Sequence, residues 1–276
     1  MADQSDVERV LVGMIGAALY PQGTQAPSVV GSVVRVYRGW PTPASLDQDL
    51  AAGAVNVTVF PELAGQVNTT RWLETIVPTA VRDPTLTATV SGVAVTIGGS
   101  PGVGQVVGLR VDNIAVVHRI EAGDTSEQVA AVLGAYLRAT RIVNVTGATV
   151  SIPGASSVVA RVVADQDALS QTRRQRQNFR ISCWCPDPST RDAIGGAIDS
   201  ALSSRTFVGL PDGLSGRLRF VSSIVVDRAQ EAALYRRDLI YSVDYATTVA
   251  VVTPTMIFGA SKTSTAPGSA LKTVLS

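Results

Sequence analysis

The sequence predicts an α+β fold, in which a mixed or antiparallel sheet carries two packed helices. A small α+β module is inserted into this core, and an extended arm follows it. Three observations lead to this prediction. Two segments repeat apolar residues at helical spacing, several segments alternate β-branched and polar residues, and residues 83–165 are rich in Val, Thr, Gly and Ala with almost no aromatic residues.

Composition and charge bound the classes of protein to which the chain can belong. It has 276 residues, of which 46% are hydrophobic and 16% charged, so it is long enough for one large domain or two small ones. The formal net charge of +1 gives no global field for wrapping nucleic acid. We expect no membrane span and no secretory signal, because no long apolar run occurs and the first residues are polar. Two cysteines cannot form a disulfide framework, which favours a reducing cytoplasm.

The first and last helices of the core are predicted from their apolar stripes. In the first, Ser5 and Glu8 have the spacing of a capping box, and Pro21 ends the helix. In the last, Ser189 and Asp192 are the expected caps. A short helix is expected over 44–52. The stripe residues are Val7, Val10, Leu11, Met14, Ile15, Ala18 and Leu19 in the first helix, and Ile194, Ile198, Ala201 and Leu202 in the last.

Alternating patterns predict the strands of the core. The expected strands cover 32–38, 54–60, 70–78, 178–185, 216–227 and 233–252. The polar and basic stretch 171–178 is predicted to be a hinge. The discontinuous core domain is therefore expected to comprise 1–82 and 166–253.

The inserted module, 83–165, has the residues to form a core of its own. It is predicted to contain strands over 86–97, 105–120, 142–152 and 157–163, and a helix over 125–139 with Thr125 and Gln128 at capping-box spacing. The final segment, 254–276, has no periodicity. We expect an arm that becomes ordered only on a neighbouring molecule, or a frayed end of the chain.

The residue types that carry catalysis or bind metals do not form a complete set. His118 is the only histidine and no Gly-x-Ser-x-Gly elbow surrounds a serine, so the sequence does not support a nucleophilic triad. Cys183 and Cys185 lack a second ligand pair for zinc. The two thiols are predicted to pack in the core, with a cross-subunit disulfide as the alternative. The glycines between 98 and 104 have no Lys-Ser/Thr after them and predict a turn. We therefore expect no enzyme, no cofactor and no metal.

Basic clusters and one tryptophan are the candidate interface residues. The clusters fit solvated loops, ion pairs between subunits, or a ring lumen that meets DNA phosphates without reading sequence. Trp40, in a Gly-Trp-Pro turn, is the candidate anchor, although it could instead pack on the adjacent sheet. The complete set of candidates is Trp40, Arg38, Arg71, Arg173, Arg174, Arg176, Arg236 and Arg237.

Two blocks of the core carry recognisable motifs. The first runs from Val36-Tyr37-Arg38-Gly39-Trp40-Pro41 through Leu46-Asp47-x-Asp49-Leu50 to Phe60-Pro61 and Asn68-Thr69-Thr70-Arg71. The second runs from Asn178-Phe179-Arg180-Ile181 through Pro211-Asp212-Gly213 to Leu234-Tyr235-Arg236-Arg237-Asp238. Together the blocks span about two thirds of the chain and resemble tail-terminator and tail-completion proteins of tailed bacteriophages and prophages. The segment between Ile97 and Thr125 resembles small accessory modules of phage structural proteins.

This resemblance implies a structural subunit that forms a hexameric ring on the tail tube. The ring would cap the head-proximal end of the tail in the virion, stop tail polymerisation and support head–tail joining, after assembly in the host cytoplasm. Its partners would be copies of itself, the tube protein, a neck or connector protein, and the sheath protein in a contractile tail, with DNA passing through the lumen and no membrane contact.

The inserted module departs from the pattern, because terminators of this family are typically shorter. Another neck or baseplate adaptor is therefore the alternative. A soluble enzyme or a carbohydrate-binding protein is a third class.

Overall fold

The computed structural model describes residues 2–71, 75–229, 234–263 and 272–275, and it confirms the α+β class. The chain divides into two compact units. Unit 1 comprises residues 1–76 and 169–249, and unit 2 comprises residues 77–168 and 250–276. The units differ from the predicted domains, which are a core of 1–82 and 166–253, an insert of 83–165 and an arm of 254–276.

Unit 1 is built on a mixed sheet. Its main strands lie in the order β1 (Val34–Arg38), β2 (Val55–Pro61), β12 (Gln166–Cys185), β15 (Leu234–Thr253), β14 (Ser215–Ala229) and β13 (Phe207–Gly209). Two further strands, β3 (Val67–Asn68) and β4 (Thr75–Ala80), pair with β12. β1 runs parallel to β2, whereas β2 is antiparallel to β12 and β14 is antiparallel to β15. The sheet therefore joins segments from both ends of the unit's sequence.

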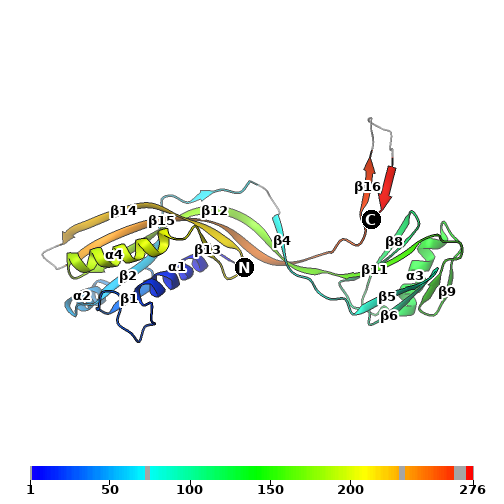
Figure 1. Ribbon diagram of the computed structural model, residues 1–276, viewed down its shortest axis with the longest axis horizontal. Coiled ribbons are helices and arrows are strands. Elements are labelled where there is room, and N and C mark those ends of the chain that lie inside the picture. The colour runs from blue at the N-terminus through cyan, green and yellow to red at the C-terminus, as the bar shows by residue number, and fades with distance from the viewer. Residues whose placement is uncertain (1, 72–74, 230–233, 264–271, 276) are drawn as a thin grey trace. The chain divides into compact units, whose positions relative to one another are not determined.

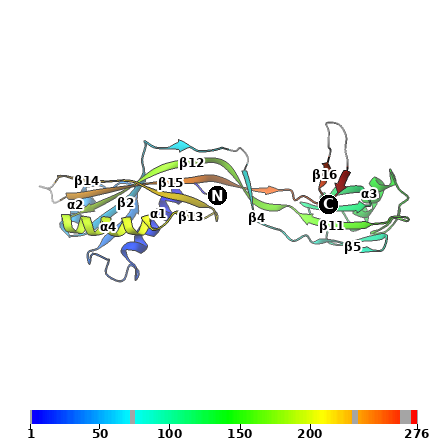
Figure 2. The ribbon, with the colours of Figure 1, turned by 45° about the horizontal axis from the view of Figure 1, so that its top comes forward.

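Two helices cover one face of this sheet. Both α1 (Gln4–Leu19) and α4 (Pro188–Ser203) lie on the same side of the long strands (Figures 1 and 2). Residues of both apolar stripes, such as Leu11 and Ile198, are fully buried in one core with alternate residues of β12 and β15, such as Phe179 and Tyr241. The predicted pair of packed helices is thus present, because each stripe meets an apolar strand face.

The predicted caps of α1 and α4 are wrong. Asp3 is the N-cap of α1, and its carboxylate accepts a hydrogen bond from the backbone N–H of Ser5 at 2.7 Å. α4 is capped by Asp187. In both helices the cap lies two residues before the serine that was expected to provide it. Several polar residues near a helix start can satisfy free N–H groups, and spacing alone does not decide between them.

The predicted hinge at 171–178 is also wrong, because this stretch is part of the long strand β12. Two of its glutamines, Gln175 and Gln177, are buried and hydrogen-bonded. The amide of Gln175 donates to the hydroxyl of Tyr245 at 2.6 Å, and that of Gln177 donates to the carbonyl of Glu62 at 2.6 Å. Hydrogen-bond partners that are distant in sequence therefore satisfy the amides of these glutamines, although the composition of the stretch suggested exposure to solvent.

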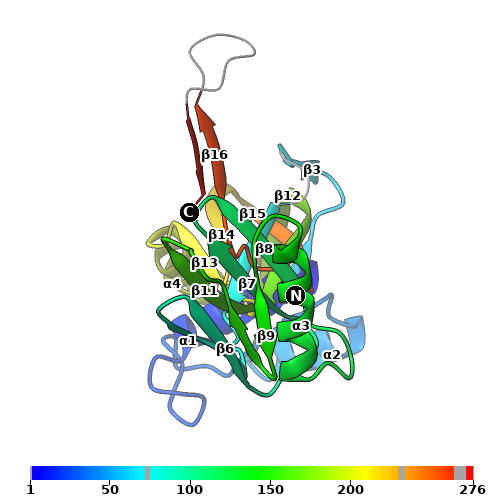
Figure 3. The same cartoon turned by 90° about the vertical axis from the view of Figure 1, so that its right-hand side faces the viewer.

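Residues 83–168 of unit 2 form two small sheets and one helix. One sheet has the order β5 (Leu86–Ser91), β6 (Ala94–Gly99), β10 (Thr149–Ser151), β9 (Asn144–Thr146), and the other β11 (Val158–Ala164), β7 (Gln105–Val111), β8 (Ile114–Arg119). Helix α3 (Ser126–Arg138) lies against the strands (Figure 3) and has the predicted Thr125–Gln128 capping box. The expected strands 86–97 and 105–120 are hairpins, because two-residue turns at Gly92 and Asp112 interrupt them at positive φ.

The described residues after 253, namely 254–263 and 272–275, belong to unit 2, so the prediction of a separate arm is wrong for them. The hydroxyl of Thr255 donates to the carbonyl of Ala164 at 2.7 Å, and the guanidinium of Arg161 lies 5.5 Å from the ring of Phe258. Two short strands, β16 (Ala260–Thr263) and β17 (Lys272–Leu275), pair beyond this point. The segment packs because Gly108 on β7 leaves room for Ile257 and Phe258.

Replacing Gly108 with alanine is expected to displace the segment 255–258. A β-carbon at this position would lie 2.7 Å from a ring carbon of Phe258 and 3.1 Å from a methyl carbon of Ile257. We expect faster proteolysis after Thr253, read by intact-mass spectrometry. The control combines Gly108→Ala with Phe258→Ala. Because Phe258→Ala removes the clashing ring, Gly108→Ala should cost less stability in the Phe258→Ala background than it does alone. Unchanged cleavage would contradict the packing.

Candidate functional site

The sheet of unit 1 has a second face, opposite α1 and α4, and this face carries most of the predicted candidates. It is formed by alternate residues of β12, namely Arg174, Arg176, Arg180, Ser182 and Trp184, and by the neighbouring residues of β2, β15 and β14. Helix α2 (Pro43–Ala51) covers one end, where Leu46 and Leu50 pack on Trp184. Charged and polar side chains, among them Arg174, Arg176, Arg180, Ser182 and Asp238, occupy much of the rest of the second face.

An aromatic cluster lies at the α2 end of the second face. The ring of Trp40 is 4.7 Å from that of Phe60 and 5.1 Å from that of Trp184, both edge-on. The guanidinium of Arg236 lies 4.9 Å from the Trp184 ring and 5.9 Å from the Trp40 ring. Trp40 is nevertheless 55% exposed. It packs on the sheet, as one of the two predictions had it, and still offers a ring edge to a neighbour.

A buried polar network occupies the middle of the second face. The carboxylate of Asp238 accepts hydrogen bonds from the hydroxyl of Ser182 at 2.7 Å, from Arg180 at 3.2 Å and from Arg236 at 3.0 Å. Arg180 also pairs with Glu62 at 2.5 Å, and these two carboxylates raise the pKa of Arg180. Arg236 is therefore a structural residue as well as a neighbour of the tryptophans.

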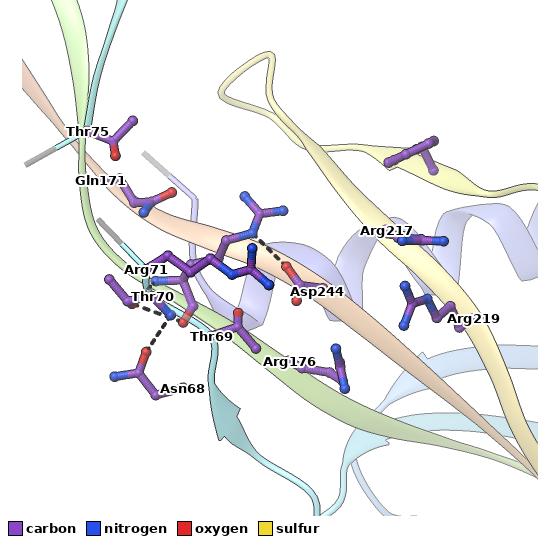
Figure 4. A pocket seen from close by; sticks show the side chains of 12 residues that line it. Asn68, Thr69, Thr70, Arg71, Thr75, Gln171, Arg176, Arg217, Arg219 and Asp244 are labelled. Atoms are coloured by element: carbon purple, nitrogen blue, oxygen red, sulfur yellow. Dashed lines mark hydrogen bonds and ion pairs between the residues drawn. The ribbon is translucent and has the colours of Figure 1, made fainter. Parts of the chain in front are cut away.

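An arginine groove lies at the far end of the second face from α2 (Figure 4). It is an open hollow of about 840 Å³ that contains five arginines and a single acid. The segment before β4 is fixed along β12, because Thr70 accepts from the backbone N–H of Arg174 at 2.7 Å. Asp244 pairs with Arg174 at 2.7 Å. The groove is lined by Asn68, Thr69, Thr70, Arg71, Thr75, Gln171, Arg174, Arg176, Phe207, Arg217, Arg219 and Asp244.

The structure gathers three of the predicted candidates in the groove, brings Trp40 and Arg236 together in the aromatic cluster, and places the other three elsewhere. Arg71, Arg174 and Arg176 line the groove. Arg38 instead pairs with the largely buried Glu8 at 2.8 Å, and Arg237 bonds to Ser223 at 3.0 Å beneath Gly195 of α4. Arg173 is exposed next to Arg174, but alternation along β12 turns its side chain to the other face. These three positions contribute nothing to the groove.

The sequence analysis missed Arg217 and Arg219, which complete the groove. Both are exposed on β14, and Arg217 lies opposite Asp244 of β15 in the strand register. The available signal was the Arg-Leu-Arg alternation between Gly216 and Phe220, which places two arginines on the same strand face. Their distance in sequence from Arg71 and Arg174 hid the cluster.

The two thiols lie in the helix-covered core. Cys183 and Cys185 are free and fully buried, and burial raises the pKa of Cys183 well above its usual value and that of Cys185 to about 12. We expect neither thiol to react with a thiol reagent at pH 8, because little thiolate forms and no reagent reaches it. Both should react after denaturation in guanidinium, as a colorimetric thiol assay would record. One fast-reacting thiol in the native chain would contradict this burial.

Other chemistry-bearing residues of the described chain are engaged structurally. In unit 2, His118 bonds to Asp124 at 2.9 Å, and Asp124 also accepts from the backbone N–H of Glu121 at 2.8 Å, which lowers the pKa of Asp124. Within the described residues, no three His, Cys, Asp or Glu side chains gather in a way that could hold a metal ion. None of the described helices combines the length and apolarity needed to cross a membrane.

No protein-family model matches the chain, and no curated protein matches it.

Proposed function

We propose that this chain is a non-enzymatic structural subunit of a bacteriophage tail, which assembles with copies of itself into a hexameric ring at the head-proximal end of the tail tube. The observation that carries the proposal is the meeting of the two motif blocks. β2 of the first block pairs with β12 of the second, from Phe179 opposite Pro61 to Trp184 opposite Asn56. Blocks far apart in sequence thus lie in one sheet, and this supports the sheet-and-helix protomer that the resemblance implies.

The outer edge of β14 supports self-association. β13 pairs with β14 only between Ser215 and Arg217, and no other described strand lies on that side of β14. Four apolar side chains along the remaining strand are between 45% and 51% exposed. They are Phe220, Val221, Ile224 and Val225. A long apolar edge is a surface that proteins usually protect, and a neighbouring copy would cover it.

The assembly state of the purified full-length chain tests this proposal. We expect native mass spectrometry and negative-stain microscopy to show rings of six subunits. The double variant Ile224→Lys/Val225→Lys places two charges on the β14 edge and should yield monomers. In the matched control, Val103→Lys, a side chain that is 75% exposed in unit 2 is replaced, and rings should persist. A wild-type chain that stays monomeric at tens of micromolar would overturn the proposal.

The place in the virion is tested separately. Deletion of the gene should give tails of uncontrolled length that do not join heads, and antibody should label the head-proximal end of wild-type tails. Normal tails that fail to adsorb, with label at the distal end, would instead indicate a baseplate adaptor. The partners expected in the first case are the tube protein, a neck or connector protein, and the sheath protein of a contractile tail.

A further inference from the structure

We propose that the arginine groove is a binding site for the phosphodiester backbone of DNA. The chain as a whole carries a net charge of only +1, yet this groove gathers five guanidinium groups around one carboxylate. Asp244 is paired with Arg174, and among the described residues no carboxylate forms an ion pair with Arg71, Arg176, Arg217 or Arg219. Four cations are therefore left to attract an anion from outside.

The arginines form a regular array because strands carry them. Arg174 and Arg176 are two residues apart on β12, as are Arg217 and Arg219 on β14, so each pair is separated by roughly 7 Å along its strand. β15 lies between the two strands, which places the pairs roughly 10 Å apart across the sheet. Figure 4 shows the side chains of Arg176, Arg217 and Arg219 on this face, together with that of Asp244. A repeating array of cations matches a ligand with repeating charge.

The other groups in the groove favour a phosphate backbone over an acidic protein. Its uncharged polar lining residues are Asn68, Gln171 and three threonines. The side-chain amides of Asn68 and Gln171 can donate hydrogen bonds to phosphate oxygens, whereas the hydroxyl of Thr70 already donates to the carbonyl of Arg174 at 3.2 Å. Phe207 is the one hydrophobic side chain of the lining and is 60% exposed. The centre of a protein–protein interface is usually more apolar than this. Arginine also binds phosphate through two parallel hydrogen bonds, which lysine cannot do.

DNA binding by the full-length chain tests the site. Fluorescence anisotropy would follow a labelled 20-base-pair duplex of mixed sequence, and the corresponding single strand, between 50 and 200 mM salt. We expect micromolar binding at the low-salt end, independent of sequence. Arg217→Ala/Arg219→Ala should weaken duplex binding on the order of 100-fold at 50 mM salt and reduce the slope of log K against log salt by about 1.8. For the single strand the slope should fall by about 1.4.

Two controls separate the groove from net charge. Arg9→Ala/Arg205→Ala removes two exposed arginines of unit 1 outside the groove, so it should leave the slope unchanged. Arg217→Lys/Arg219→Lys keeps the charges and should retain the slope with weaker affinity. Thermal unfolding checks that each variant is folded, which we expect because both side chains are exposed.

Each remaining outcome counts against the site. No DNA binding at 50 mM salt would overturn it, as would equal losses in the groove and control variants. Binding of polyglutamate in preference to both DNAs would assign the groove to an acidic protein. The oligomeric state is measured on the same samples, and a groove variant that loses its ring together with DNA binding would make the groove a subunit contact. Intact rings without DNA binding would refute this inference and leave the proposed function standing.

Discussion

Replacing Asp238 with alanine is expected to lower the free energy of unfolding of unit 1 by about 3–5 kcal/mol. The carboxylate is 1% exposed and accepts hydrogen bonds from Ser182, Arg180 and Arg236. Arg180 keeps Glu62 as a partner, but Arg236, whose side chain is 21% exposed, loses its only ion pair among the described residues. The large effect comes from leaving a desolvated guanidinium without its carboxylate, since a buried pair itself adds little net stability.

Urea unfolding followed by tryptophan fluorescence measures this loss. All three tryptophans, at positions 40, 72 and 184, belong to the stretches of unit 1, so the signal reports that unit. Asp238→Asn keeps an acceptor for Ser182 and should cost less than alanine. In the control, Asp192→Ala, the 62% exposed partner of Arg191 is removed, and the cost should stay below about 1 kcal/mol. Equal effects for Asp192→Ala and Asp238→Ala would show that the network is not a buried one.

Phe179→Ala and Leu133→Ala are expected to destabilise different parts of the chain. Phe179 is fully buried in the core of unit 1, and Leu133 in the core of unit 2. The two cores share no residue. Truncation should cost about 3–5 kcal/mol for phenylalanine and about 2–5 kcal/mol for leucine, because transfer free energy is lost and a cavity remains.

Two probes distinguish the effects. Phe179→Ala should move the tryptophan transition to lower urea, whereas Leu133→Ala should leave that transition in place and move part of the far-ultraviolet circular dichroism change. The conservative variants Phe179→Leu and Leu133→Met should follow the same division with smaller shifts. If either alanine variant shifts both probes equally, the units unfold together and their cores are coupled.

The features predicted from the sequence are those that local chemistry determines. The stripe of α1 and the Thr125–Gln128 box of α3 are set by residues within one or two turns of helix, and both are present. The stretch 171–178 was misread because the burial of Gln175 and Gln177 depends on Tyr245 and Glu62, which are far away in sequence. Likewise, the hairpin turns at Gly92 and Asp112 lie within continuous β-rich runs.

The candidate site could be predicted only in part for the same reason. Arg71, Arg174 and Arg176 were recognised as basic residues, but nothing near them in sequence indicates that β15 and β14 place Asp244 and Arg219 alongside. Strand order determines which charges become neighbours, and strand order is a long-range property. Arg38 and Arg237 are equally basic, but Arg38 forms an ion pair with Glu8 and Arg237 donates a hydrogen bond to Ser223, so neither lines the groove.

Because Ile257 and Phe258 fill the space above Gly108, residues 77–168 alone do not make up the whole of unit 2 and cannot be transferred to another protein as a complete domain. A chimera that exchanged only residues 77–168 would either leave Ile257 and Phe258 without the β7 surface on which they pack, or leave that surface of β7 exposed. Grafting experiments, and any natural recombination that moved this unit between proteins, would have to transfer the stretch after Thr253 along with it.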